Sequence, residues 1–177
     1  MLRLLTLLAA SSLIPLAACG PKARAVMHKD GTGPSVGWLE FEDIGNDTIH
    51  LYGKISGLSP GKHGTHVHIW GDLTAGCESV GAHFNPTNTT HGGPQSAERH
   101  VGDLGNIEAG PNGDATVDIY DKVISFSGEN SILSRGLAIH NGEDDLGLGT
   151  FSDSKLNGHS GTRFACGTIA LANFTNP

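Results

Sequence analysis

Residues 49–56, Ile-His-Leu-Tyr-Gly-Lys-Ile-Ser, carry the clearest structural pattern in this chain. Apolar or small residues at positions 49, 51, 53 and 55 alternate with His, Tyr, Lys and Ser at positions 50, 52, 54 and 56. A period of two residues places the two sets on opposite faces of an extended segment. Turn sequences flank it, Gly45-Asn46-Asp47 before and Ser59-Pro60-Gly61 after. The stretch therefore predicts a β-strand with one buried face and one exposed face.

The composition of the chain also favours β-strands. The chain has 26 glycines among 177 residues and only 16% charged residues, which favours short strands joined by turns over long helices. The length allows one domain with a substantial core. Two connections, Gly71–Gly102 and Asn141–Arg163, are much longer than the others, and loops of this length usually have a function. We predict an all-β domain with strands at residues 25–30, 36–43, 48–57, 65–70, 103–109, 115–121, 136–141 and 165–171.

Residues 1–18 are typical of a signal peptide, because Arg3 precedes an apolar stretch that ends in small residues. The following Cys19 completes the segment Leu-Ala-Ala-Cys-Gly, which resembles a bacterial lipobox, where the mature cysteine carries a diacylglycerol. We therefore expect a lipidated Cys19, a linker over residues 19–24 and a domain over residues 25–177. Gly20 favours the outer membrane, so the expected location is the periplasmic side of a bacterial cell envelope. The alternatives are a plain signal peptide and an untouched apolar N-terminus.

The charge of the chain argues against one class of partner. The formal net charge is −7, and Arg3 is the only charged residue in 1–18, so the mature chain carries 10 basic and 18 acidic residues, a net charge of −8. An acidic chain of this kind is not expected to bind nucleic acid. No segment after Cys19 is long and apolar enough to span a bilayer.

The chain contains three cysteines, Cys19, Cys77 and Cys166. If lipid occupies Cys19, the other two are left to form a disulfide, and export makes that bond possible. The alternative is two free, buried thiols.

Side chains that bind metal are concentrated between residues 66 and 103. They are His66, His68, His83, His91, His100 and Asp103. Imidazole and carboxylate ligands suit zinc and copper. The first two histidines are two residues apart in a predicted strand, so both project from one face and can hold one ion together.

The remaining residues of this run suggest a second ion. Three imidazoles and one carboxylate would close a four-coordinate zinc site. His140, at the end of a predicted strand, would join the His66 and His68 pair in an all-imidazole set, which can bind both oxidation states of copper. Six histidines and one aspartate make seven ligands, whereas two four-coordinate ions need eight. One imidazole must therefore be shared through its two ring nitrogens, and the spacing does not say which.

Many spaced motifs in residues 25–172 together resemble the copper/zinc superoxide dismutase family. They are Gly64-Thr65-His66-Val67-His68, Gly71-Asp72, Thr74-Ala75-Gly76-Cys77, Ala82-His83-Phe84-Asn85-Pro86, His91-Gly92-Gly93-Pro94, Glu98-Arg99-His100-Val101-Gly102-Asp103-Leu104-Gly105-Asn106, Asp144-Asp145-Leu146-Gly147 and Arg163-Phe164-Ala165-Cys166-Gly167.

The resemblance implies a fold and a set of ligands. The fold would be an eight-stranded Greek-key β-barrel, an immunoglobulin-like sandwich with two long functional loops, closed by a Cys77–Cys166 disulfide. Asp144 would hydrogen-bond His66 and His91 from outside the two sites. His83 would be the bridging ligand. Copper would be held by His66, His68, His83 and His140, and zinc by His83, His91, His100 and Asp103.

The implied activity is the conversion of two superoxide anions and protons into dioxygen and hydrogen peroxide, which would protect the cell envelope. Copper would alternate between its oxidation states, His83 would carry a proton, and Arg163 would dock the anion. The loop at residues 149–156 departs from the family pattern, because Lys155 is displaced by one position and acids are few. A homodimer is the commonest assembly. One alternative is an envelope copper/zinc binding or delivery protein without turnover. The other is an interaction module that a structural zinc ion stabilises.

Four further histidines match no ligand position. We expect His63 to support its loop through hydrogen bonds. The others, His28, His50 and His159, are expected to be solvated or locally hydrogen-bonded.

Overall fold

The computed structural model describes residues 20–172, so the predicted signal peptide and Cys19 lie outside the described residues. Within this range the chain forms ten strands, a 3-10 turn at Glu78–Val80 and a short helix α1 at Ser154–Asn157. The strands are β1 Lys22–Lys29, β2 Ser35–Asp43, β3 Ile49–Ile55, β4 Gly61–His68, β5 Thr74–Cys77, β6 Asp103–Ala109, β7 Ala115–Asp121, β8 Gly136–His140, β9 Arg163–Thr168 and β10 Ala170–Leu171.

All eight predicted strands are present. β6 and β7 have the predicted bounds, and the other six have shifted ends. β1 starts at Lys22, so residues 22–24, which we expected in the linker, lie in the strand. β4 covers residues 61–68 instead of 65–70. The short strand β5 was not predicted, because four residues are too few to show a periodic pattern. The predicted strand at residues 165–171 is divided in the structure into β9 and β10.

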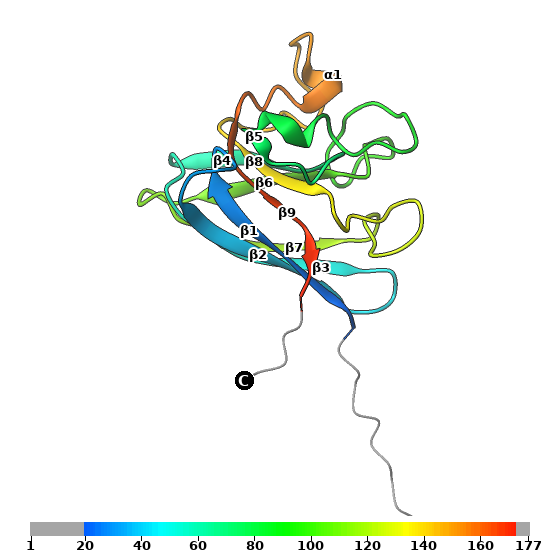
Figure 1. Cartoon of the computed structure of the whole chain (residues 1–177). Helices are drawn as coiled ribbons and strands as arrows, with labels where there is room; N and C mark the ends of the chain where they lie inside the picture. Colours follow the sequence, from blue (N-terminus) through cyan, green and yellow to red (C-terminus); the bar gives the residue numbers. More distant parts are fainter. Residues whose placement is uncertain (1–19, 173–177) are drawn as a thin grey trace, which may run out of the picture.

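The eight longer strands form a closed antiparallel barrel in the order β1-β2-β3-β7-β6-β4-β8-β9. Pairing of β1 with β9, where His28 lies opposite Cys166, closes the sheet. Strands β3 and β4 follow one another in the sequence but are separated in the sheet by β7 and β6, so their connection crosses the barrel as in a Greek key. The predicted all-β barrel is therefore confirmed (Figure 1).

The interior of the barrel follows from the alternation in its strands. In β3, Ile49, Leu51 and Ile55 are buried while Lys54 is exposed, which confirms the predicted half-buried strand. In β4, Val67 points into the same core. Burial of these side chains is the main stabilising contribution to the barrel. The fully buried members of largest volume include Met27, Leu39, Phe41, Leu51, Ile55, Leu104, Ile132, Leu137, Ile139 and Ile169.

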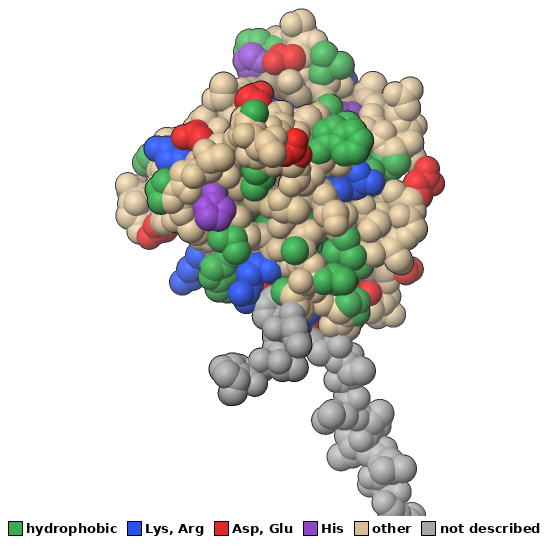
Figure 2. Space-filling model, viewed as in Figure 1, with side chains coloured by type: hydrophobic (Ala, Val, Ile, Leu, Met, Phe, Trp, Pro, Cys, Tyr) green, Lys and Arg blue, Asp and Glu red, His purple; other side chains and the backbone are tan. Residues whose placement is uncertain are grey.

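The two long connections lie together at one end of the barrel, where β5 and α1 appear near the top of Figure 1. They are tied to each other, because the backbone N–H of His91 donates to the carbonyl of Lys155 at 2.9 Å. The second loop is also tied to β4 by a bond of 2.9 Å from Gly64 N–H to the carbonyl of Gly142. Charged side chains of both signs are scattered over the face seen in Figure 2, without one dominant patch. No helix within residues 20–172 is long and apolar enough to cross a membrane.

Candidate metal centre

The site begins on β4, which alternates between the core and the loops. Val67 faces the core, so His66 and His68 project from the opposite face, where the long loops cover them completely. The pairing of β4 with β6 is irregular between Gly64 and His66. Irregularities of this kind redirect side chains and are common beside active sites.

The first long loop turns back on β4 and places His83 beside it. Ile69 N–H donates to the carbonyl of Ala82, Phe84 N–H donates to Val67, and His68 and His83 form an isolated antiparallel bridge. As a result, the ring centroid of His83 lies 4.0 Å from that of His66 and 5.0 Å from that of His68.

His140 completes the first cluster from the end of β8, where the pairing with β9 is also irregular. Its ring centroid lies 4.8 Å from that of His66. One ligand atom from each of four buried histidines lies within 4.8 Å of the others, and these are His66, His68, His83 and His140.

The second cluster surrounds Asp103, the first residue of β6. Its Oδ1 lies 2.9 Å from Nδ1 of His83 and 3.2 Å from Nδ1 of His100, and its Oδ2 lies 3.0 Å from Nδ1 of His91. These separations approach the edge of about 3.3 Å in a tetrahedron with metal–ligand bonds of about 2.0 Å. Ligand atoms of His66, His83, His91 and Asp103 also lie within 4.8 Å of one another, so the two clusters overlap.

Buried nitrogens without partners show that these clusters suit metal ions. Among residues 20–172, the buried side-chain nitrogens and oxygens that lack a hydrogen bond are six imidazole nitrogens and Nε of Arg163. Buried polar atoms are normally paired, because an unpaired one is costly. The six imidazole atoms are Nδ1 of His66, His91 and His100 and Nε2 of His68, His83 and His140.

The opposite ring nitrogens are mostly held by protein. Nδ1 of His68 lies 2.9 Å from the carbonyl of Gly81, and Nδ1 of His140 lies 3.0 Å from that of Gly161. Such contacts fix the ring orientation and leave the other nitrogen available for a metal.

Asp144 joins the two clusters from outside. Its Oδ2 lies 2.9 Å from Nε2 of His66, and its Oδ1 lies 2.8 Å from Nε2 of His91. Asn106 holds the Asp144 backbone by a pair of hydrogen bonds of 2.8 Å each. One buried carboxylate therefore orients one imidazole of each cluster.

Burial sets the protonation of the first cluster. Desolvation lowers the pKa of His83, lowers those of His66 and His68 further, and brings that of His140 to about 4. All four rings are therefore neutral at pH 7, and a neutral ring can bind a metal without first losing a proton.

In the second cluster, interactions between charged groups outweigh burial in setting the pKa values. Desolvation would lower the pKa of His91, but the carboxylates of Asp103 and Asp144 outweigh it and raise this pKa to about 9. Desolvation would likewise raise the pKa of Asp103, but the surrounding imidazoles hold it well below its usual range. Without metal, His91 is thus a cation between two carboxylates.

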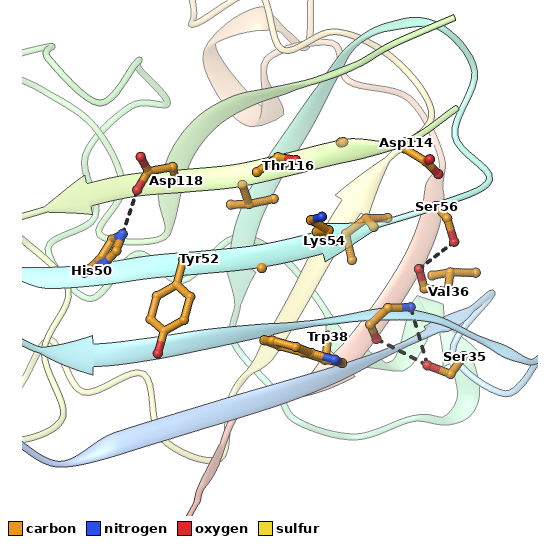
Figure 3. Close-up of a pocket in the computed structure, with 15 residues that line it drawn as sticks. Ser35, Val36, Trp38, His50, Tyr52, Lys54, Ser56, Asp114, Thr116 and Asp118 are labelled. Atoms are coloured by element: carbon orange, nitrogen blue, oxygen red, sulfur yellow. Dashed lines mark hydrogen bonds and ion pairs between the residues drawn. The ribbon is translucent and has the colours of Figure 1, made fainter. Parts of the chain in front are cut away.

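A pocket opens onto the first cluster. Arg163 lines it together with His83 and His140, and the register of β8 and β9 places Arg163 opposite His140. A larger hollow lies on the outer face of β2, β3 and β7, where Figure 3 shows Trp38, Tyr52 and His50. No residue of either metal cluster lines that hollow, so the chemistry belongs to the smaller pocket.

Two predictions about other side chains are also confirmed. Cys77 and Cys166 form a disulfide with a Cα–Cα separation of 5.7 Å, which ties β5 to β9. His63 is buried, and its ring nitrogens contact the carbonyls of His140 and Ser59 at 2.7 and 2.8 Å. His63 thus supports the strand end that carries His140.

Two residues that matter here received no individual role from the sequence. Arg99 is buried, pairs with Asp121 at 2.8 Å, and donates to the carbonyls of Pro94, His100 and Val101, which fixes the loop around His100. Gly158, at φ +69°, packs against the Asp144–His91 contact, and a Cβ there would lie 2.6 Å from Nε2 of His91. No sequence pattern marks these long-range contacts.

Known proteins resemble this chain over most of its length. A family model described as copper/zinc superoxide dismutase matches residues 35–169. Superoxide dismutase (Cu-Zn) 3 of Arabidopsis thaliana is 51% identical over 148 residues, which cover 84% of this chain and 90% of the relative. Superoxide dismutase (Cu-Zn) 5 of Dictyostelium discoideum is 48% identical over 151 residues, which cover 85% of this chain and 97% of the relative.

Two further matches extend the comparison. The extracellular superoxide dismutase (Cu-Zn) of Caenorhabditis elegans is 43% identical over 171 residues, which cover 94% of this chain and 77% of the relative. The crystal structure of the clock protein EA4 matches with a TM-score of 0.80 at 39% identity and covers 85% of this chain and 94% of that one. This chain belongs to the copper/zinc superoxide dismutase family.

Proposed function

We propose that copper is held by His66, His68, His83 and His140 and zinc by His83, His91, His100 and Asp103, with His83 shared. The choice of His100 over His66 as the fourth zinc ligand rests on their nitrogens. Nδ1 of His100 is buried, makes no hydrogen bond and lies 3.2 Å from Asp103 Oδ1. His66 has one nitrogen engaged by Asp144, so its single free nitrogen can serve only one ion.

The activity is copper/zinc superoxide dismutation. The observation that carries the assignment of residues is the set of six buried imidazole nitrogens without a hydrogen bond, together with Arg163 in the pocket that His83 and His140 line. Bound copper supplies one-electron chemistry by changing oxidation state, whereas zinc does no redox chemistry. Arg163 supplies a permanent positive charge beside His140, where a small anion can dock. Nε2 of His83 is the atom that would hold and return a proton.

A superoxide consumption assay on copper- and zinc-loaded protein tests this assignment against a binding or delivery role. We expect rapid consumption by the wild type and a large loss in His140→Ala, which keeps the zinc ligands. A metal-loaded wild type that consumes no superoxide would instead support the binding or delivery role.

We propose further that the chain is exported and lipidated at Cys19, and that it protects a bacterial cell envelope from the periplasmic side, with the outer membrane favoured. The pattern of residues 1–20 supports this proposal. The named relatives are eukaryotic, and one of them is described as extracellular, which favours secretion without lipid as a second candidate. Mass spectrometry of the mature N-terminus separates the two, because an unmodified Cys19 would rule out the anchor.

We also propose a homodimer, the commonest symmetric assembly. Sedimentation velocity of the purified protein tests it, and a single monomeric species at micromolar concentration would contradict it.

A further inference from the structure

Arg163 already has an anionic neighbour within the protein. Its Nη1 donates to Oε2 of Glu78 at 2.9 Å, and its Nη2 donates to the carbonyl of Gly81 at 2.5 Å. Its Nε is buried and has no hydrogen-bond partner. Two of the five N–H donors of the guanidinium are thus occupied by protein acceptors, and Nε–H and the second N–H of each Nη remain as donors for an incoming anion.

The fold keeps this pair together. Glu78 directly follows Cys77, which is bonded to Cys166 on the same strand as Arg163. Gly81 lies in the same short segment as Glu78, and its carbonyl also contacts Nδ1 of His68. The disulfide therefore holds the carboxylate of Glu78 within reach of the one arginine that lines the pocket.

The wall of the pocket has little positive charge of its own. Its permanent charges are one cation, Arg163, and two carboxylates, Glu78 and Asp153. Asp153 lies 2.7 Å from Nδ1 of His159, so Glu78 is the acid that contacts the cation directly. Leu156, which also lines the pocket, is 68% exposed and adds no charge.

Exposure determines what such a carboxylate can do. The side chain of Glu78 is 78% exposed, whereas that of Arg163 is 16% exposed. An exposed ion pair is weak, so an anion that reaches Arg163 can displace Glu78 into solvent. While the pair is formed, however, it offsets part of the charge that attracts an anion.

We propose that Glu78 competes with the anionic substrate for Arg163 and thereby weakens both the anion affinity of the pocket and the dependence of superoxide uptake on ionic strength. This inference rests on the proposed docking role of Arg163. Glu78 is then a residue that tunes substrate capture and takes no part in metal binding.

The test compares Glu78→Gln with wild type, both loaded with copper and zinc. Gln keeps an acceptor for Nη1 but removes the negative charge. Azide, a small monoanion, serves as the probe of the pocket, and its dissociation constant is read from the visible absorption of copper. We expect azide to bind about two- to fivefold more tightly to Glu78→Gln, the range that an exposed ion pair allows.

The second readout is superoxide decay as a function of ionic strength. Removal of one negative charge at the mouth of the pocket should raise the rate of superoxide consumption at low salt by a similar factor of about two to five. It should also make that rate fall more steeply as the salt concentration rises. The matched control is Glu129→Gln, which removes an exposed acid outside the pocket lining and should behave as wild type.

A third variant separates competition from positioning. If Glu78 competes, Glu78→Ala should also bind azide more tightly, because Gly81 still holds Nη2. Loss of azide affinity in Glu78→Ala with no change in Glu78→Gln would mean that Glu78 only positions the arginine, and it would overturn the proposal. Unchanged azide affinity in both variants would overturn it too. Tighter azide binding without superoxide turnover in any variant, including wild type, would support the competition and refute the proposed function.

Discussion

Nδ1 of His83 lies 2.9 Å from Oδ1 of Asp103, at the centre of one cluster, while Nε2 of the same ring is buried without a partner and faces the other. The centroid of His83 is 4.0 Å from that of His66 and 5.6 Å from that of His100. One imidazole therefore reaches both clusters from opposite edges. Seven side chains can supply eight ligand positions in this arrangement.

A shared imidazole must give up both ring protons. We predict that uptake of copper by the zinc-loaded protein releases about one proton, because the other three copper ligands are already neutral. Titration of copper into lightly buffered protein with a pH indicator measures the release. His83→Ala should bind copper through its three remaining imidazoles and release no such proton. Equal proton release from both proteins would argue against the shared ring.

Asp144 contacts one imidazole of each cluster, so its loss should disturb both. We predict that Asp144→Asn lowers zinc affinity by about ten- to a hundredfold, the usual effect of removing a carboxylate that orients a ligand. Competition with a chelator measures this change. The neighbouring Glu143→Gln is the control, because Glu143 is exposed and pairs with Lys62 at 3.0 Å. Equal affinity of the Asp144 variant and wild type would show that the contact orients nothing.

Gly158 allows the backbone to approach the Asp144–His91 contact closely. Gly158→Ala should lower stability by more than the roughly 1 kcal/mol that a left-handed backbone costs an alanine, because its Cβ would also displace Asp144. Gly128 has a similar φ, +72°, with nothing within 4 Å of its Cβ position, so Gly128→Ala isolates the backbone cost. Thermal unfolding and zinc affinity should both change more at Gly158. Identical losses at the two positions would contradict the steric argument.

Zinc affinity should depend on pH through His91. Because the pKa of His91 in the metal-free protein is raised to about 9, protons compete with zinc below that pH. Apparent affinity should therefore rise by up to about tenfold per pH unit towards pH 9 and level off above it. Isothermal titration in buffers of different ionisation enthalpy should show about one proton released per zinc at pH 7.5. Zinc binding without proton release at that pH would mean that His91 is neutral.

The same pKa has a consequence for the metal-free fold. The pKa of His91 is higher in the folded chain than the unperturbed value of 6.5. Its contribution to stability is thus fully present below about pH 6.5 and is lost as the pH rises through 9. The metal-free wild type should lose stability over this range, as measured by denaturant unfolding, whereas His91→Ala should lose less.

Arg163 lines the pocket and binds no metal in the proposed assignment. We predict that Arg163→Ala lowers the rate of superoxide consumption and weakens its dependence on ionic strength, while copper and zinc contents stay at wild-type levels. Metal analysis and superoxide decay on the same sample measure both. Unaltered kinetics would refute the docking role.

Local patterns predicted the strands and the ligand types, but not the contacts that orient them. The alternation in β3 and the spacing of His66 and His68 follow from a period of two residues, which any single strand displays. The role of Arg99 depends on Asp121, and that of Gly158 depends on Asp144, and neither partner is a neighbour along the chain. The pairing of Glu78 with Arg163 likewise spans 85 residues and depends on how the first long loop folds onto β9.

The most direct test of superoxide dismutation by this chain is the decay of superoxide after pulse generation, followed with full-length protein that carries measured amounts of copper and zinc. Superoxide dismutases are among the enzymes that approach the diffusional limit of about 10⁸–10⁹ M⁻¹s⁻¹. We predict a second-order rate constant near the lower end of that range, proportional to bound copper and lost in His140→Ala. A decay no faster in the copper- and zinc-loaded protein than in the zinc-only protein would contradict copper-dependent superoxide dismutation by this chain.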